Sequence, residues 1–291
     1  MRISVATAAA CLAAALAAPA LALADSGAAP AAPRDRAAAA PKALVALGLT
    51  ADQRLVRFAV DKPAETKTLG RISGLTGDTR LVGIDRRVQN LALYGVGDQG
   101  GVYTLDTAAR AVKVSQLTVA LAGARFGVDF NPAANRLRVI SDTGQNLRHN
   151  IDDAAGAPGT VVDGTLTNPT APPATAQGVT GAAYTNNDLD AATATTLFDI
   201  DTLADRVVLQ SPANAGSLAP TGGLGVDAGP DAGFDIHFSP ADGVNRGFAA
   251  LQRGSAHRLY EVDVLTGAVR DLGAFPARRQ VTDIALPIDR S

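Results

Sequence analysis

The chain has 291 residues, of which 47% are hydrophobic but only 4% aromatic, so alanine, valine and leucine must supply most of the buried area. Lysine and arginine number 26 against 28 aspartate and glutamate residues, and no basic block occurs. This balance lacks the electrostatic footprint of a nucleic-acid-binding protein, so we expect no nucleic-acid partner. A single all-β domain of this length is common.

The N-terminal segment, residues 1–24, has the parts of a signal peptide: a cation at Arg2, an apolar run over residues 5–21 and a small-x-small cleavage site at 22–24. We therefore expect a secreted or periplasmic protein. The run is shorter and richer in alanine than a membrane span of about 20 strongly apolar residues, so the mature chain is expected to have no transmembrane span. The sole cysteine, Cys11, lies in this segment, which leaves the mature chain without a disulfide.

Residues 25–42 are rich in alanine and proline and show no hydrophobic alternation. Their prolines would interrupt an alanine-rich helix, because proline removes a backbone donor. Such a composition predicts a disordered linker. The folded part is therefore expected to be a single domain over residues 43–289.

The folded part repeats a unit of short strands separated by turns. The clearest unit is Gly127 to Asn150, where an Asn-Pro turn joins two strands and Asp142-Thr143-Gly144 leads into a third. In chain order the predicted strands are 44–49, 54–61 and 66–73; 81–87, 91–97, 101–107 and 111–117; 126–132, 136–142, 146–152 and 159–166; 178–185, 195–201, 206–212 and 217–224; 233–240, 245–251, 257–263 and 268–275. Taking Val82, Val128, Val179 and Phe234 as corresponding positions gives a period of 46 to 55 residues, which is typical of propeller blades.

The first of these five segments lacks an innermost strand, and the chain ends with an unassigned strand at Val281 to Pro287. In a ring, the terminal strand would complete the first blade and leave no long unpaired edge. We therefore predict an all-β fold, a five-bladed β-propeller closed by the C-terminal strand. The alternatives are six blades, because residues 177–225 can be divided in more than one way, and a β-sandwich or β-solenoid.

Several apparent motifs do not fit a known chemistry. The GxGxxG string at residues 95–100 precedes a strand, whereas a dinucleotide site needs a helix there. No HExxH, GxSxG or Walker pattern occurs, and His149, His237 and His257 show no metal-ligand spacing. The groups at Asn186 to Asp190, and at Asp199 with Asp201, are interpreted as hairpin loops and strand ends. We therefore assign no catalytic residue.

Four aspartates occupy comparable positions on the predicted innermost strands: Asp85, Asp129, Asp235 and Asp283, with Gly181 in the remaining blade. Carboxylates that converge on the axis could bind a cation such as Ca²⁺ or raise one another's pKa. Alternatively, each carboxylate accepts hydrogen bonds from backbone amides of the neighbouring blade, as a latch that satisfies a buried polar group. The latch is favoured, and beyond Ca²⁺ the sequence implies no cofactor.

A second polar cluster, Asp142, Gln145, Asn146 and Arg148, lies in and after the turn between the second and third strands of blade three. Arginine, asparagine and glutamine together suit a hydroxyl-rich or anionic ligand. This turn should share a face with the connections between blades, of which residues 166–177 and 222–233 are unusually long. A ligand site at these four residues and a merely solvated rim remain open hypotheses.

The strings NRLRVISDTGQNLR and GAAYTNND, with TTLFDIDT and SLAPTGGLGVDA, resemble the domain-of-unknown-function family numbered four-three-nine-four over Leu44 to Leu286. The resemblance implies an exported bacterial protein of propeller-like, WD40-like architecture with no established activity. The chain departs from the aromatic-rich blade signature, and Arg86-Arg87 stands where blade three has Phe130 and an Asn-Pro turn.

Two functional classes are consistent with these features. The first is a binding or interaction module that uses the loop-rich face of the propeller for a small polar ligand, a glycan or an envelope protein. The alternative is a cation-dependent hydrolase or lyase acting on a sugar or lactone through the channel carboxylates. We favour the first, because the sequence contains no recognisable nucleophile or metal motif.

Overall fold

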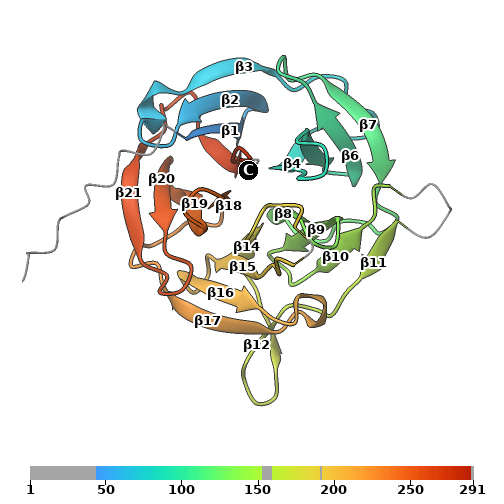
Figure 1. Ribbon diagram of the computed structural model, residues 1–291, viewed down its shortest axis with the longest axis vertical. Helices are drawn as coiled ribbons and strands as arrows, with labels where there is room; N and C mark the ends of the chain where they lie inside the picture. Colours follow the sequence, from blue (N-terminus) through green and yellow to red (C-terminus); the bar gives the residue numbers. More distant parts are fainter. Residues whose placement is uncertain (1–43, 153–158, 191, 290–291) are drawn as a thin grey trace, which may run out of the picture. The chain divides into compact units, whose positions relative to one another are not determined.

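The computed structural model describes residues 44–152, 159–190 and 192–289, which form five four-stranded antiparallel sheets arranged as the blades of a propeller (Figure 1). The predicted signal peptide, the linker and Cys11 lie outside the described residues. The blades are, from the inside outward, β22 (Val281–Ala285), β1 (Val45–Thr50), β2 (Arg54–Ala59) and β3 (Lys67–Arg71); β4 (Leu81–Arg86), β5 (Leu93–Gly97), β6 (Gly101–Leu105) and β7 (Ala111–Gln116); β8 (Phe126–Asn131), β9 (Arg136–Ser141), β10 (Asn146–His149) and β11 (Thr160–Val162); β14 (Val179–Tyr184), β15 (Leu197–Asp201), β16 (Arg206–Gln210) and β17 (Leu218–Gly223); and β18 (Ala232–Ser239), β19 (Val244–Arg253), β20 (Ala256–Val262) and β21 (Val269–Ala274).

The ring closes as predicted. The C-terminal strand β22 pairs antiparallel with β1, placing Gly48 opposite Ile284 and Leu49 opposite Asp283. Blade 1 therefore combines the beginning and the end of the folded domain. The five-bladed prediction is confirmed, and the six-bladed, sandwich and solenoid alternatives are wrong for this chain.

The core is divided among the junctions between blades, with one hydrophobic cluster at each. Aromatic contacts strengthen two of them, since Phe58 packs on Phe275 and Tyr94 on Phe130 with ring centroids 5.0 and 5.1 Å apart. Elsewhere small residues bring the backbones together. A Cβ on Gly127 would lie 2.7 Å from the amide nitrogen of Ala182 in the next blade, closer than packed atoms allow.

The long connection between blades 3 and 4 is more ordered than its composition indicates. It contains a two-stranded sheet, β12 (Thr167–Asn168) with β13 (Ala174–Thr175), which projects outside the ring in Figure 1. Two single-turn helices, η1 (Pro63–Glu65) and η2 (Ala213–Ala215), complete the secondary structure of the described residues. Neither is long enough to cross a membrane, and no other helix is described.

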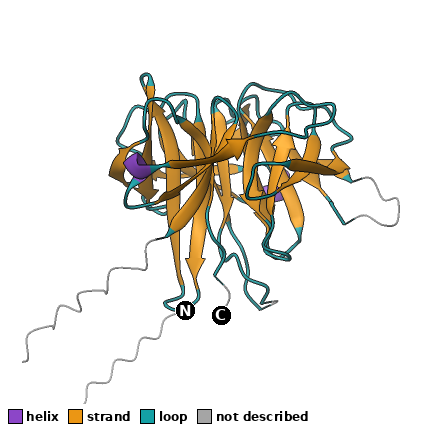
Figure 2. Ribbon diagram, turned by 90° about the horizontal axis from the view of Figure 1, so that it is seen from above, coloured by secondary structure: helices purple, strands orange, loops and turns teal. Residues whose placement is uncertain are grey.

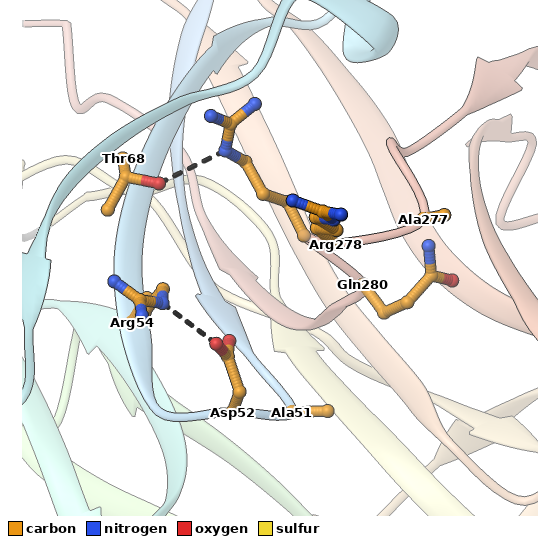
Figure 3. Close-up of a pocket in the computed structure, with 8 residues that line it drawn as sticks. Ala51, Asp52, Arg54, Thr68, Ala277, Arg278 and Gln280 are labelled. Carbon is orange, nitrogen blue, oxygen red and sulfur yellow. Dashed lines mark hydrogen bonds and ion pairs between the residues drawn. The ribbon is translucent and has the colours of Figure 1, made fainter.

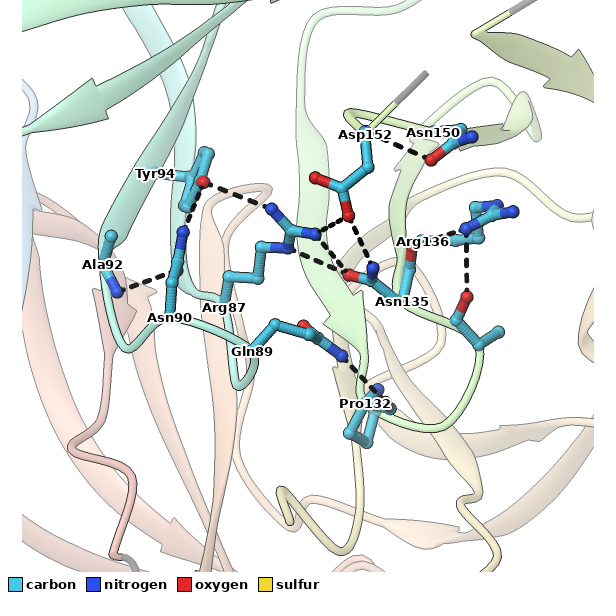
Figure 4. Close-up of polar contacts among 11 residues, drawn as sticks. Arg87, Gln89, Asn90, Ala92, Tyr94, Pro132, Asn135, Arg136, Asn150 and Asp152 are labelled. Carbon is cyan, nitrogen blue, oxygen red and sulfur yellow. Dashed lines mark hydrogen bonds and ion pairs between the residues drawn. The ribbon is translucent and has the colours of Figure 1, made fainter. Parts of the chain in front are cut away.

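The unusual Arg86-Arg87 pair does not disturb blade 2, which has four regular strands. Arg87 instead reaches across the junction, where its Nε and Nη2 donate to Oδ1 of Asn135 at 2.9 and 2.8 Å and Nη2 also pairs with Asp152 (Figure 4). Asp152 accepts a further hydrogen bond from Asn135. Arg87 therefore ties blade 2 to the first hairpin of blade 3.

The strands run between two loop-bearing faces of the ring (Figure 2). Because successive strands are antiparallel, the turns between second and third strands lie on the same face as the connections between blades. We call this the connection face. Gln145, in such a turn, bonds the backbone of Ala120 and Ala122 in the connection before β8, which confirms the shared face predicted from the sequence.

Candidate functional site

The innermost strands carry aspartates that latch each blade to the next one. In Asp283, Asp85 and Asp235 the Oδ2 atom accepts the backbone N–H of Ile84, Phe130 and Leu286, respectively, at 2.6–2.7 Å. Asp129 Oδ1 accepts the N–H of Tyr184 at 3.2 Å. Asp283, Asp85 and Asp235 also accept, through Oδ1, the backbone N–H of the residue that follows each of them. The latch predicted from the sequence is thus present at four of the five junctions.

Blade 4 lacks the latch, and the alignment proposed for it needs correction. In blades 2, 3 and 5 a glycine lies two residues before the aspartate. In β14 the corresponding glycine is Gly181, and the residue two positions later is Ala183. Gly181 approaches the next blade closely, since a Cβ there would meet Phe234 Cβ at 2.9 Å, and Ala183 packs in the hydrophobic cluster shared with blade 5. Ala183, not Gly181, is therefore the counterpart of the aspartates.

Asparagines replace the missing latch between blades 4 and 5. Asn186 and Asn245 exchange two hydrogen bonds, of 2.8 and 2.6 Å, and Asn187 donates to the carbonyl of Ile236 at 2.9 Å. Asn186 and Asn187 follow β14, where the sequence suggested a hairpin loop, and Asn245 belongs to β19. Their role is a contact between blades.

Three of the four predicted axial aspartates converge. One carboxylate oxygen from each of Asp85, Asp129 and Asp235 lies within 4.8 Å of the other two, and all three side chains are buried. Asp283 is also buried but lies outside this group. The charge of Asp283 nevertheless raises the pKa of Asp85 and Asp129. Cation binding by the four aspartates stays a prediction.

Burial of these carboxylates disfavours their charged form. Burial raises the pKa of Asp85 well above the usual value, and the nearby charge of Asp235 raises it further. Burial, with the charges of Asp85 and Asp235, has the same effect on the pKa of Asp129. Burial raises the pKa of Asp235 to about 7, although the amides of Leu286 and Ile236 oppose the shift. The cluster can therefore take up protons near neutral pH, or hold a cation in their place.

The second predicted cluster is held by bonds within the protein. Asp142 accepts the backbone N–H of Ala124 at 3.0 Å, and Gln145 bonds the backbone of Ala120 and Ala122 at 2.9 Å. These two side chains fix the connection that leads into β8. Ligand binding by them stays a prediction, but their observed contacts position the loop.

Asn146 and Arg148 belong to a different group between blades 3 and 4, in which Asn146 is buried and Arg148 is half-buried. Arg148 forms two hydrogen bonds with Asp163, at 2.6 and 3.0 Å. The buried Arg138 also binds Asp163, at 2.7 Å, and donates to Asn146 Oδ1 at 2.6 Å. Arg138 further contacts Tyr184 in blade 4. A buried arginine is stable only when paired in this way, so the cluster acts as an ionic joint.

Asp199 lies near this joint without a hydrogen bond to it. The side chain is 0% exposed, and neither carboxylate oxygen has a hydrogen-bond donor among the described residues. Burial raises its pKa well above the usual value, and the charge of Arg138 only partly opposes this shift. Burial therefore favours the neutral form of this carboxyl group over the charged form.

A pocket of about 200 Å³ opens at the axis on the connection face, and the sequence did not indicate it. All five blades contribute lining residues: Gln53, Arg80, Arg125, Thr180, Asp231 and Thr282 supply the polar groups. Arg80, Arg125 and Asp231 each stand immediately before an innermost strand. A polar residue recurring at that place was the signal available in the sequence.

One wall of this pocket is an ion-paired group. Arg125 of blade 3 pairs with Asp231 of blade 5, and His257 Nε2 lies 3.7 Å from the same carboxylate. Burial raises the pKa of Asp231, but the hydrogen bond to His257 and the charge of Arg125 outweigh it, so the pKa is lowered overall. Asp231 therefore stays charged and holds Arg125 at the pocket, while Arg80 is exposed.

Comparison with known families gives one match. The profile of a family described as Domain of unknown function (DUF4394) matches residues 54–285, which is most of the propeller. No curated protein matches the sequence.

The similar solved structures are distant. A protein of unknown function from Bacteroides thetaiotaomicron VPI-5482 is 15% identical, with 80% of this chain and 56% of that chain covered and a TM-score of 0.44. A Lactobacillus plantarum protein is 21% identical, covering 79% and 66%, with a TM-score of 0.38. An auxiliary nutrient binding protein from Bacteroides ovatus ATCC 8483 is 14% identical, covering 78% and 49%, with a TM-score of 0.39. The chain spans about half to two thirds of their lengths, and likeness at this level carries no information on function.

Proposed function

We propose that the chain, which belongs to the DUF4394 family, is a binding module whose ligand site is the axial pocket on the connection face. The observation that supports this proposal most directly is that all five blades place residues around one pocket. Propeller closure therefore creates the pocket, and a misplaced blade would destroy it.

The lining indicates the ligand class. Arg80 and Arg125 offer guanidinium donors, which suit carboxylate or phosphate groups, and the hydroxyls of Thr180 and Thr282 can donate or accept. Asp231 can accept hydrogen bonds from ligand hydroxyls. The volume of about 200 Å³ is below the usual range of about 300–1,000 Å³ for drug-sized ligands. The proposed ligand is therefore a small hydroxylated anion, such as a sugar acid.

The residues predicted as ligand-binding have an indirect part in this proposal. Asp142 and Gln145 hold residues 120–124, and the pocket is lined by Ala124, the last residue of that segment, and by Arg125, which follows it. The two side chains would thus position the Arg125 wall. Alanine at Gln145 should weaken binding less than alanine at Arg80.

Isothermal titration calorimetry against hexoses, hexuronates and short hydroxy acids tests the proposal. A hexuronate should bind, and Arg80→Ala should weaken its binding about tenfold, as expected for the loss of one charge-assisted hydrogen bond. Arg110→Ala is the matched control, because Arg110 is exposed and lies outside the pocket. Failure of every compound to bind, or equal binding by the Arg80 and Arg110 variants, would refute the proposed site.

We further propose that this module acts outside the cytoplasm, in the periplasm or after secretion. The support is the signal-peptide pattern of residues 1–24. Mass spectrometry of the protein from cell fractions provides the test. An N-terminus at Asp25 in the periplasmic fraction or medium is expected, and a full-length cytoplasmic chain would exclude export.

A further inference from the structure

A second, larger groove lies on the connection face, away from the axis and over blade 1. It has a volume of about 580 Å³ and is lined by two segments far apart in the sequence (Figure 3). One wall is the turn between β1 and β2, with Asp52 and Arg54, together with Thr68 of β3. The other wall is residues 277–280, the connection that leads into β22.

Cationic side chains dominate this groove. Arg54, Arg278 and Arg279 all line it, whereas Asp52 is the one carboxylate among its lining residues. Asp52 accepts hydrogen bonds from Arg54 Nε at 2.8 Å and from the Thr50 hydroxyl at 2.6 Å. Among the three arginines of the groove, its ion-pair partner is Arg54. The lining therefore carries a net charge of +2, from three arginines and one aspartate.

Hydrogen bonds hold the walls of this groove in place. Arg279 donates from Nε to Thr68 Oγ1 and from Nη1 to the carbonyl of Thr66, both at 3.1 Å, so its guanidinium is held across the two walls. Gln280 accepts the backbone N–H of His257 at 2.5 Å and donates to the carbonyl of Pro276 at 2.9 Å, which fixes the connection. Such anchoring lowers the entropy lost when a ligand binds.

Arg278 differs from its neighbours. Its side chain is exposed on the groove and has no hydrogen bond or ion pair among the described residues. All five N–H donors of this guanidinium are available, and their planar fork matches the oxygens of phosphate, sulfate or carboxylate.

We propose that this groove is an oxyanion site, with Arg278 as the principal contact and Arg54 and Arg279 as flanking charges. It takes a ligand with two or more negative charges, because the lining has a net charge of +2. The bound anion bridges the first hairpin and the last connection of the domain. Occupancy therefore stabilises closure of the ring at β22, a role that is separate from ligand capture at the axis.

Calorimetric titration of pyrophosphate, sulfate and citrate at low ionic strength tests the site, since screening weakens exposed charges. At least one of these anions should bind and raise the melting temperature, and amide protons of β22 should exchange more slowly in its presence. Arg278→Ala should weaken binding about tenfold or more, whereas Arg110→Ala should not. The identity of the tightest anion distinguishes a phosphate site from a sulfate or carboxylate site.

The two proposals fail separately. Arg80→Ala, in the axial pocket, should leave pyrophosphate and sulfate binding unchanged, because neither anion carries the carbon-bound hydroxyl groups proposed for the axial ligand. Arg278→Ala should leave hexuronate binding unchanged. Binding of none of the three anions, or equal binding by the Arg278 and Arg110 variants, would overturn the oxyanion site. If only the Arg80 variant lost pyrophosphate or sulfate binding, these anions would belong to the axial pocket, and the oxyanion site over blade 1 would again be overturned.

Discussion

Replacement of Asp235 by asparagine should change how the stability of the protein depends on pH. Asp235 is buried and accepts the amides of Leu286 and Ile236, and its pKa of about 7 lies above the ordinary value of 3.8. The folded protein therefore keeps a proton on this group between about pH 4 and 7, where the unfolded chain has lost it. Stability is favoured at low pH and falls as the pH rises through 7.

The magnitude follows from the two pKa values. A difference of about 3 pKa units, at about 1.4 kcal/mol each, corresponds to about 4 kcal/mol of unfolding free energy lost between pH 4 and 8. Asparagine cannot ionise, so it avoids this loss. It can accept only one of the two amides through its single oxygen, at a cost of about 1–3 kcal/mol. At pH 4 the unfolding free energy of Asp235→Asn should therefore be equal to or lower than that of the wild type. Between pH 4 and pH 8 the difference should shift in favour of the variant by up to about 4 kcal/mol.

Urea unfolding at constant ionic strength, from pH 4 to 8, measures this difference. Asp61→Asn is the control, because Asp61 is exposed on a turn. Its curve should run parallel to that of the wild type. A constant offset between Asp235→Asn and the wild type over the whole range would refute the conclusion that Asp235 titrates near neutral pH in the folded state.

The remaining predictions concern the other buried charges. Asp199→Asn should raise the unfolding free energy at pH 8 by about 1–3 kcal/mol, because the carboxylate has no donor; a less stable variant in urea unfolding would show that a donor such as bound water serves it. Arg138→Met should cost about 3–5 kcal/mol, and Arg136→Met, at a half-buried strand end, about 1 kcal/mol or less; equal losses in the same assay would contradict the ionic joint. Millimolar Ca²⁺ should leave the melting temperature unchanged, because amides and protons already satisfy the axial carboxylates. A rise that Asp129→Asn abolishes would instead establish an axial cation site and favour the cation-dependent hydrolase or lyase.

Local sequence pattern was sufficient for the strands and for the closure of the ring. Alternation of apolar residues and the turns between them predicted every strand of the five blades, and the unassigned strand at Val281 to Pro287 predicted β22. The aspartate latch was also predictable, because Asp85, Asp129 and Asp235 recur at one place in the blade. Each of these features depends on residues within a single repeat or on an equivalent position in several repeats.

The assignment of function to side chains depended on contacts between repeats, which a linear pattern does not contain. Asn146 and Arg148 had the composition of a ligand site, but Arg138 and Asp163 engage them in the folded protein. The axial pocket and the groove over blade 1 could not be predicted from the sequence, because their lining residues come from different blades or from the two ends of the domain. Periodicity within a strand determines its hydrogen-bonding partners and its buried face. Which polar groups meet, and which stay available to a ligand, is decided only when the blades pack around the axis.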